Sequence, residues 1–421
     1  QKCGRYHACR NVPQFLEERF DKRVKTVMAF FWLIVFVFVN LTSILYLGAL
    51  TIQSVMGIPL LYGVIGLALF AVVYSINGGL KAVALTDVIQ VFFLVGGGLI
   101  TTYIALDLLG AGEGVLKGCE TLYLKTEDKF HLILDPSHPG YMDLPGLSVI
   151  LGGLWVANLY YWGCNQYIIQ RALAAKNIKE AQWGMAFAGV IKLLIPLLVV
   201  IPGIAAFALD APLSKPDEAY PWLLGNLLPV GVKGIAFAAL TAAIVSSLAS
   251  MMNSISTIFT MDIYQVYIRP EGDASHLVRV GKMTSLVAML IGVCIAPLLS
   301  GLDQAFQYIQ EFTGFVSPGA LSIFLAGFFY KRATSNGALV SAVASFVLSF
   351  VFKYLFPSLP WLDRMGIIFL LCCAILVLMG KKNPKGDDAD RLLSRSLFHT
   401  DRIFNWTALF VVIILIVFYF L

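Results

Sequence analysis

Charged residues are scarce in this chain. Asp, Glu, Lys and Arg make up 13% of its 421 residues, whereas hydrophobic residues make up 59%. The mean hydropathy is +0.81. A soluble domain carries about twice this share of charge, so these values exclude an ordinary soluble protein. The net charge of +5 reflects arginines and lysines in loops and gives no indication of nucleic-acid binding.

The sequence also lacks the residue patterns of a metal site or a catalytic site. Four cysteines, Cys164, Cys294, Cys372 and Cys373, lie in apolar segments, where they are small hydrophobic residues. The polar residues of the apolar segments form no nucleophile–base pair and no group of metal ligands. We therefore expect neither an enzyme nor a cofactor other than a coupling ion. The remaining cysteines, which also lack metal-ligand spacing, are Cys3, Cys9 and Cys119.

Long apolar runs recur from one end of the chain to the other. Each is about 20 residues long, which is enough to cross a hydrocarbon core of roughly 30 Å. The pattern predicts an all-helical, polytopic membrane protein with a single transmembrane domain over residues 1–421. The eleven predicted spans are 26–50, 57–77, 84–109, 146–166, 181–207, 230–265, 280–300, 304–330, 336–356, 365–380 and 403–421.

Basic residues orient these spans, because cytoplasmic loops carry an excess of Lys and Arg. All the basic-rich connections fall on one side of the membrane if the even-numbered connections are cytoplasmic. This predicts a cell (inner) membrane protein with a cytoplasmic N-terminal residue and with Leu421 on the extracellular or periplasmic side. The basic residues are Arg19, Lys22, Arg23, Lys25, Lys81, Arg171, Lys176, Lys179, Arg269, Arg279, Lys282, Lys331, Arg332, Lys381, Lys382, Lys385, Arg391 and Arg395.

The chain begins at Gln1 rather than at a methionine. Residues 1–24 have the pattern of an amphipathic cytoplasmic connector and not that of a signal peptide. A cytoplasmic connector at this position suggests that earlier spans are absent from this sequence.

The stretch Ala157–Gln166 brings amides and large aromatic residues to the cytoplasm-facing end of an apolar segment. Asn158, Tyr161, Trp162 and Asn165 lie at 0, +3, +4 and +7, which places them on one helical face. Lipid cannot satisfy amides, so this face is expected to point into protein or a water-filled cavity. Such a face suits a small polyhydroxylated solute. The alternative is that the amides bridge neighbouring helices.

A stripe of small residues lies within the sixth predicted span. Ala243, Ser246, Ser247, Ser250 and Ser254 lie at 0, +3, +4, +7 and +11. Two adjacent hydroxyls beside backbone carbonyls form a neutral, all-oxygen site of the kind that sodium accepts. Close helix packing through small residues is the alternative interpretation.

Lys192 lies about a third of the way into the fifth predicted span, before Pro196 and Pro202. An ammonium at that depth costs on the order of 3 kcal/mol, so it is expected to face a cavity or a partner. Snorkelling to the interface would require a reach of about 13 Å at 1.5 Å per residue.

Further polar residues lie within the apolar segments. Asn40 is in the middle of the first predicted span, and Asp87 is just inside the cytoplasmic end of the third. Asp87 could attract a leaving cation, or it could be a hydrated interfacial acid or a helix N-terminal charge. Gly and Pro residues in the eighth span predict an interrupted helix, a device that exposes backbone groups at transport sites. Its polar stripe and its interruption comprise Gln304, Gln307, Gln310, Glu311, Gly314, Pro318 and Gly319.

Five stretches together resemble the sodium/solute symporter family, and in particular its sodium/glucose (galactose) branch. The resemblance extends over essentially the whole chain. The stretches are Asn77–Val83 with Thr86–Gln90, Asn158–Gln166, Gln170–Lys176, Ala242–Ser250 and Gln304–Glu311.

The resemblance implies a leucine-transporter-type fold with two inverted five-helix repeats, extra peripheral helices and an incomplete first repeat. It implies sodium-coupled symport of a monosaccharide by alternating access. The implied sugar ligands are Asn40, Asn158, Lys192 and Gln310, with Tyr161 as the aromatic residue that stacks on the sugar ring and Trp162 beside it. The implied sodium ligands are Ala243, Ser246 and Ser247, and Asp87 matches an acid near the sodium exit route.

The leading pair of family helices, which supply further sodium and sugar ligands, is not found in this sequence. Two other functions remain open: symport of another solute, such as an inositol, an amino acid or a carboxylate, and solute sensing without transport. The particular sugar, the sodium stoichiometry and the oligomeric state, including a homo-oligomer, also stay open.

Overall fold

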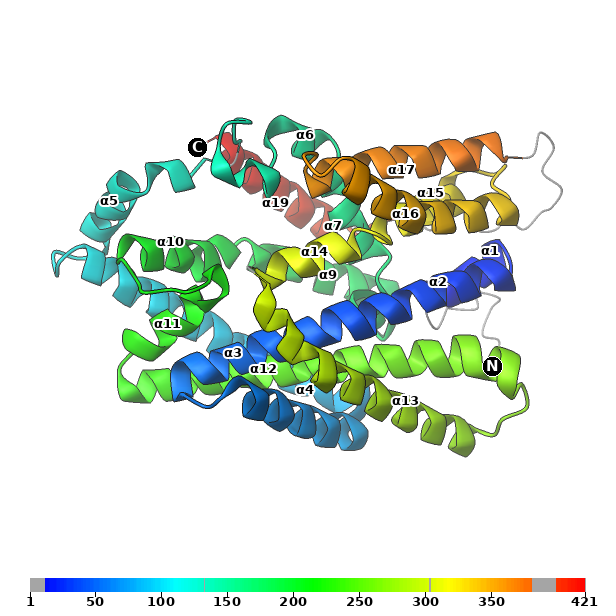
Figure 1. The fold of residues 1–421 in the computed structure, drawn as a ribbon, viewed down its shortest axis with the longest axis horizontal. Coiled ribbons are helices and arrows are strands. Elements are labelled where there is room, and N and C mark those ends of the chain that lie inside the picture. The colour runs from blue at the N-terminus through cyan, green and yellow to red at the C-terminus, as the bar shows by residue number, and fades with distance from the viewer. Residues whose placement is uncertain (1–11, 132, 303, 381–398, 421) are drawn as a thin grey trace.

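The described part of the chain is built from helices. The computed structural model describes residues 12–131, 133–302, 304–380 and 399–420, and within these ranges the sole β-pairing is one bridge between Leu134 and Pro145 (Figure 1). Cys3, Cys9, the first part of the predicted connector and the basic residues between 381 and 395 lie outside the described residues.

The helices follow one another in chain order. η1, η4 and η6 are π-helical, and η5 and η7 are short 3-10 helices. The elements are α1 (Val12–Arg19), α2 (Lys22–Ile34), η1 (Val35–Leu41), α3 (Thr42–Met56), α4 (Leu60–Leu109), α5 (Val115–Lys125), α6 (Gly146–Leu151), α7 (Gly153–Gly163), α8 (Gln166–Leu173), α9 (Ile178–Lys192), η4 (Pro196–Val200), α10 (Ile201–Ala208), η5 (Pro216–Glu218), α11 (Ala219–Asn226), α12 (Val230–Thr257), η6 (Ile258–Ile268), α13 (Ala274–Ile295), η7 (Ala296–Gly301), α14 (Ala305–Thr313), α15 (Ser317–Phe329), α16 (Ser335–Leu355), α17 (Trp361–Leu378) and α19 (Arg402–Phe420).

The first long helix is continuous through α2, η1 and α3. It extends over 35 residues, from Lys22 to Met56. Asp21 caps its start by accepting hydrogen bonds from the next backbone N–H groups. Gly57 ends it in the left-handed conformation, with a φ of 71° that glycine adopts without strain. The π-helical middle segment holds Asn40, and segments of this kind occur often at functional sites.

The helix α4 doubles back on itself. The hydroxyls of Tyr74 and Thr86 hydrogen-bond to each other, although 12 residues of straight helix would separate them by about 18 Å. The chain therefore bends sharply between these two residues. The two arms of α4 coincide with the ranges 57–77 and 84–109 that the sequence predicts as separate spans.

Within the described ranges, three helix pairs are bent at short breaks. α14 and α15 meet at 41°, which confirms the interruption predicted from Gly314 and Pro318. α9 and the helix that starts at Pro196 also meet at 41°, because proline cannot continue the hydrogen-bond ladder. Together these breaks divide two of the apolar segments into half-helices.

The third bend corrects one prediction. α7 and α8 meet at 45°, so Asn165 does not continue the helical face of Asn158 and Tyr161. Instead, Asn165 is the buried N-cap of α8, and its side chain accepts a hydrogen bond from the Tyr167 N–H at 3.1 Å. Gly163 and an asparagine two residues later favour a helix end followed by a new helix start, and this local preference overrides the apparent periodicity.

The largest buried cluster joins α2, α7, α12 and α15. At its centre the Trp32 indole N–H donates to the Tyr160 hydroxyl at 3.1 Å, and both side chains are fully buried. Phe324 on α15 packs against the Trp32 ring, with ring centroids 6.4 Å apart. This cluster fixes α7, which carries Asn158 and Tyr161, to the long first helix.

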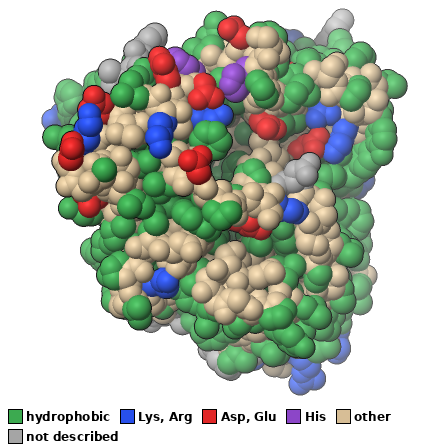
Figure 2. Space-filling model, turned by 60° about the vertical axis from the view of Figure 1, so that its left-hand side comes forward, with side chains coloured by type: hydrophobic (Ala, Val, Ile, Leu, Met, Phe, Trp, Pro, Cys, Tyr) green, Lys and Arg blue, Asp and Glu red, His purple; other side chains and the backbone are tan. Residues whose placement is uncertain are grey.

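Helix length and hydropathy fit a multi-pass membrane protein. Among the described residues, six helices are long and apolar enough to cross a membrane, or up to nine if each bent pair is one span. Two shorter apolar helices, Leu60–Ser75 and Arg402–Phe418, add to these. Figure 2 shows extensive hydrophobic surface, with most of the charged side chains in the upper half of the view. The count of eleven spans stays a prediction.

Gly153 lies in the tightest contact between α7 and α17. A Cβ atom at this position would lie 1.9 Å from the Leu362 carbonyl oxygen. Gly153→Ala is therefore expected to destabilise the protein by about 1–3 kcal/mol through overpacking. The thermal unfolding temperature in detergent measures this effect. Gly184→Ala is the matched control, since a Cβ there has nothing within 4 Å, and equal unfolding temperatures for the two variants would contradict the close approach.

Candidate transport site

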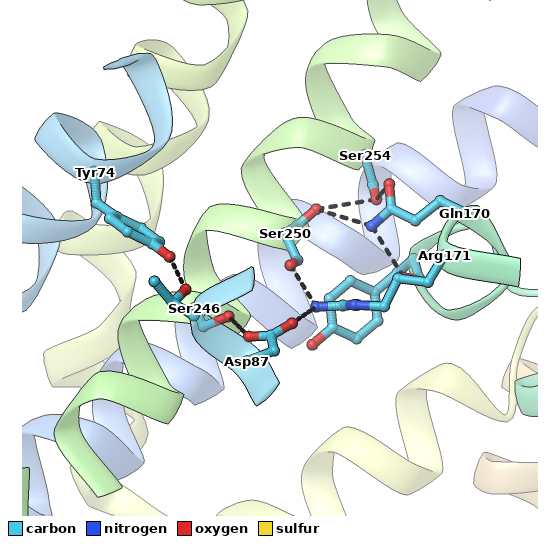
Figure 3. A network of polar contacts seen from close by, with 9 residues as sticks. Tyr74, Asp87, Gln170, Arg171, Ser246, Ser250 and Ser254 are labelled. Carbon is cyan, nitrogen blue, oxygen red and sulfur yellow. Dashed lines mark hydrogen bonds and ion pairs between the residues drawn. The ribbon is translucent and has the colours of Figure 1, made fainter. Parts of the chain in front are cut away.

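A polar junction joins α4, α8 and α12 near the predicted cytoplasmic end of the molecule (Figure 3). The Asp87 carboxylate forms an ion pair with Arg171 at 2.8 Å and also accepts a hydrogen bond from the Ser246 hydroxyl. Arg171 reaches α12 as well, because it donates to the Ser250 hydroxyl at 2.9 Å. The Asp87 carboxylate therefore joins α4 to α8 and α12, which are far apart in the sequence.

A second set of contacts extends this junction along α12. Gln170 donates to the Ser250 carbonyl at 3.5 Å, and the Ser254 hydroxyl donates to the Gln170 side-chain oxygen at 3.2 Å (Figure 3). Ser246, Ser250 and Ser254 are all buried. The serine stripe is thus more than close helix packing, because three of its hydroxyls contact side chains of α4 and α8.

Asp87 is not an isolated interfacial acid. Its side chain is 27% exposed, and both of its oxygens have protein partners. The positive-inside pattern places Arg171 in a cytoplasmic connection and gives no partner for it, whereas the structure pairs it with Asp87. The sequence does place one acid and one arginine at the cytoplasmic ends of two apolar segments. Formation of an ion pair there reduces the cost of both charges, and this is the signal that could have predicted the pair.

The predicted sodium residues lie together on α12, next to this junction. The Ser246 hydroxyl donates to Asp87, and Ser247 is the next residue of α12. Ala243 is one turn earlier on the same helix. A hydroxyl that donates its proton keeps lone pairs for a cation, so this contact leaves the Ser246 oxygen able to bind a cation.

Three of the predicted sugar residues are in mutual contact. The rings of Tyr161 and Trp162 meet edge to face with centroids 5.2 Å apart, and the Lys192 ammonium lies 4.5 Å from the centroid of the Trp162 ring. Lys192 is the last residue of α9, where a cation is favoured by the helix dipole. The lysine predicted to face a cavity or a partner is thus exposed and stacked on an aromatic ring.

The helix α8 connects the two sets of residues, because it packs against α7, which carries Tyr161, and against α12, which carries Ser246 and Ser247. Its start at the Asn165 cap, directly after the bend from α7, allows both contacts.

The other predicted sugar residues are less closely connected. Asn158 is exposed, and its amide donates to the Leu154 carbonyl of its own helix at 2.9 Å. Asn40 is half-buried, and its side-chain oxygen has no partner among the described residues. The Gln307 side-chain oxygen, on the packed neighbour α14, is buried without a described partner too. No described contact joins these residues or Gln310 to Tyr161.

Glu311 has a structural environment distinct from that of its glutamine neighbours. Its carboxylate pairs with Arg364 at 2.7 Å and with Lys353 at 3.0 Å. These ion pairs connect α14 to α16 and α17. The cavity lined by Glu311 and Arg364 also contains none of the predicted sugar ligands.

The fold and these buried polar contacts define a multi-pass membrane transporter. The Sodium:solute symporter family matches residues 7–344. The sodium/glucose cotransporter of Vibrio parahaemolyticus is 50% identical over 427 residues, covering 97% of this chain and 78% of that protein. The sodium/myo-inositol cotransporter 2 of Bos taurus is 32% identical over 368 residues, and this chain spans about half of its length, 54%.

The chain belongs to the sodium:solute symporter family. It is a secondary active transporter and not an enzyme. The solved structure of a sodium-coupled sialic acid symporter, in a substrate-bound outward-open state, matches with a TM-score of 0.74 at 21% identity. The match covers 87% of this chain and 76% of that one. It confirms the expected all-helical, leucine-transporter-type fold.

The ion pair between Asp87 and Arg171 is expected to contribute more to stability than a surface pair. A double-mutant cycle with Asp87→Asn and Arg171→Gln should give a coupling energy of about 1 kcal/mol in the free energy of unfolding, at the upper end for exposed pairs. Lys117 and Glu120 form the control pair, with side chains 47% and 58% exposed. Their coupling should lie near about 0.3 kcal/mol, and equal coupling in both pairs would contradict the assigned role of Asp87.

Proposed function

We propose that the protein is a sodium-coupled symporter of a monosaccharide of the galactose or glucose type, working by alternating access. Sodium binds at Ala243, Ser246 and Ser247 on α12. The sugar is held by Asn40, Asn158, Lys192 and Gln310 and stacks on Tyr161, with Trp162 beside it. The 50% identical sodium/glucose cotransporter supports this choice of solute.

The 50% identity with a sodium/glucose cotransporter over 97% of this chain carries the proposal. Symport requires that binding of the cation changes the affinity for the solute, and differential binding to two conformations provides this coupling. The helix α8 packs against α7, which carries Tyr161 of the proposed sugar site, and against α12, which carries the proposed sodium ligands. A movement of α8 would therefore affect both proposed sites.

The chemistry of the sugar residues supports the same solute class. A pyranose offers an apolar ring face to an aromatic residue, and its hydroxyls can bond to amides and to an ammonium. The Lys192 ammonium lies over Trp162 and has no carboxylate partner among the described residues. It can therefore exchange this weak cation–π contact for a sugar hydroxyl at small cost.

Asp87 receives the cation on its way to the cytoplasm in this scheme. Its carboxylate is paired with Arg171 and lies directly beside Ser246. Sodium leaving Ser246 would meet this carboxylate and compete with the arginine for its charge. The scheme fits a protein of the inner membrane with eleven spans, a cytoplasmic N-terminal residue and Leu421 on the outer side.

A polyol such as inositol is the second candidate solute. It is favoured by the relative named sodium/myo-inositol cotransporter 2, at 32% identity. Uptake by the complete native protein in liposomes separates the two candidates. We expect sodium-dependent uptake of labelled galactose that unlabelled galactose or glucose suppresses and that equal concentrations of inositol or proline do not. Suppression by inositol alone would favour the second candidate.

Tyr161→Ala is expected to reduce sodium-dependent galactose uptake by the complete native protein at least about ten-fold, through loss of about 1.4 kcal/mol or more of ring stacking. Uptake per unit of purified, reconstituted protein is the measurement. Tyr103→Ala, which removes an exposed tyrosine of α4, is the control and should retain uptake. Normal uptake kinetics in Tyr161→Ala would remove this residue from the sugar site.

Ser247→Ala is expected to raise the sodium concentration for half-maximal uptake by about five- to ten-fold, because loss of one hydroxyl ligand costs about 1 kcal/mol. Sodium titration of galactose uptake gives this value. The control is Ser349→Ala on α16, whose buried hydroxyl has no partner among the described residues. Identical sodium titrations for the native protein and Ser247→Ala would overturn the cation site.

A further inference from the structure

A separate cavity opens at the end of the molecule opposite to the start of α2. It lies between the last turns of α3, the loop 209–218 and α11, on the left of Figure 1. Its volume is about 280 Å³, near the lower end of the roughly 300–1,000 Å³ range of small-molecule pockets. This size suits a single sugar ring.

The polar residues of the cavity form a set that recognises hydroxyl groups. Gln53 and Ser54 are exposed, and their side chains have no hydrogen-bond partner among the described residues. One oxygen of the Glu218 carboxylate accepts a hydrogen bond from the Ser214 N–H at 2.9 Å, which fixes its orientation and leaves the other oxygen for a ligand. Amide, hydroxyl and carboxylate groups together can both donate to and accept from a sugar.

Trp222 supplies an aromatic surface in the same cavity. It is half-buried and packs against the hydrophobic cluster formed by α4, α10 and α11. This packing holds the indole in place before a ligand arrives, so little conformational entropy is lost on binding. An indole ring beside hydrogen-bonding groups offers the apolar and polar surfaces that a pyranose requires.

We propose that this cavity is an outer binding site for a neutral monosaccharide, formed by Gln53, Ser54, Glu218 and Trp222. The site is distinct from the one around Tyr161, and its choice of ligand rests on the proposed function. It holds the sugar at low affinity on the side of the membrane from which transport begins.

Other ligand classes fit the cavity less well. The Glu218 carboxylate repels anions, and no lysine or arginine is among the residues that line the cavity. The described residues contain no group of three or more His, Cys, Asp or Glu side chains that could hold a metal ion. A neutral polyhydroxylated ligand uses every polar group of the cavity.

The outer site is also connected to the broken helix α14–α15. Lys215, in the same loop as Glu218, donates to the Ser300 carbonyl and to the Leu302 carbonyl at the end of η7. The Asp217 carboxylate accepts from the Ala305 N–H at 2.7 Å, at the start of α14. A sugar bound at Glu218 therefore touches the loop that fastens the helix carrying Gln310.

Equilibrium binding of labelled galactose to the complete native protein in sodium-free buffer tests the outer site. In the Tyr161→Ala background, binding with millimolar affinity should persist. Adding Trp222→Ala should weaken it by about ten-fold, or about 1.4 kcal/mol. Adding Gln53→Ala should weaken galactose binding several-fold. Because the Gln53 side chain is exposed, its loss leaves the packing intact, so this variant tests the outer site even if Trp222→Ala does not fold.

Two substitutions outside the cavity serve as controls. Trp406→Ala removes a tryptophan that is 71% exposed on α19, and Glu120→Gln removes an exposed carboxylate on α5. Both should leave the residual binding unchanged. Absence of binding in Tyr161→Ala, or residual binding that is insensitive to both Gln53→Ala and Trp222→Ala, would overturn the outer site. Normal sodium-dependent uptake by the native protein in that case would leave the proposed function standing.

Discussion

The arrangement of the proposed cation site depends on one carboxylate, that of Asp87. It binds Arg171 of α8 and Ser246 of α12, and so ties the second arm of α4 to two other helices near the predicted cytoplasmic end, where pairing lowers the cost of both charges. Removing either charge leaves the other uncompensated, which makes the pair a constraint on the fold as well as a feature of the site. The serine stripe of α12 is kept in register with α8 by the same contacts.

The broken helix α7–α8 connects this constraint to the proposed solute site. α7, which carries Tyr161, ends at Gly163, and after a 45° bend α8, which carries Arg171, begins at the Asn165 cap. Half-helices expose backbone and side-chain groups in the middle of a membrane without leaving them unsatisfied. In the proposed mechanism, rotation about such breaks would change cation and sugar contacts together.

Much of the fold could be predicted from the sequence, because apolar runs of membrane length and the Gly and Pro residues near 314–319 act locally. The partners of polar side chains could not be predicted in the same way. Arg171 was assigned to a loop because charge counting alone does not show that it folds back onto Asp87. Asn165 was placed on a helical face because periodicity hides a helix end. The cavity at Trp222 could not be predicted either, because it forms only where the loop 209–218 packs against α3.

Sodium-coupled sugar movement through this site is the central claim. Electrical recording from the complete native protein in liposomes adsorbed to a solid support tests it most directly. With sodium on both sides, addition of galactose should produce a transient inward movement of positive charge, and replacing sodium by choline should abolish it, because the sugar cannot be carried without its cation. A galactose-induced current of the same size in choline, or no current in sodium while galactose still enters, would contradict the account.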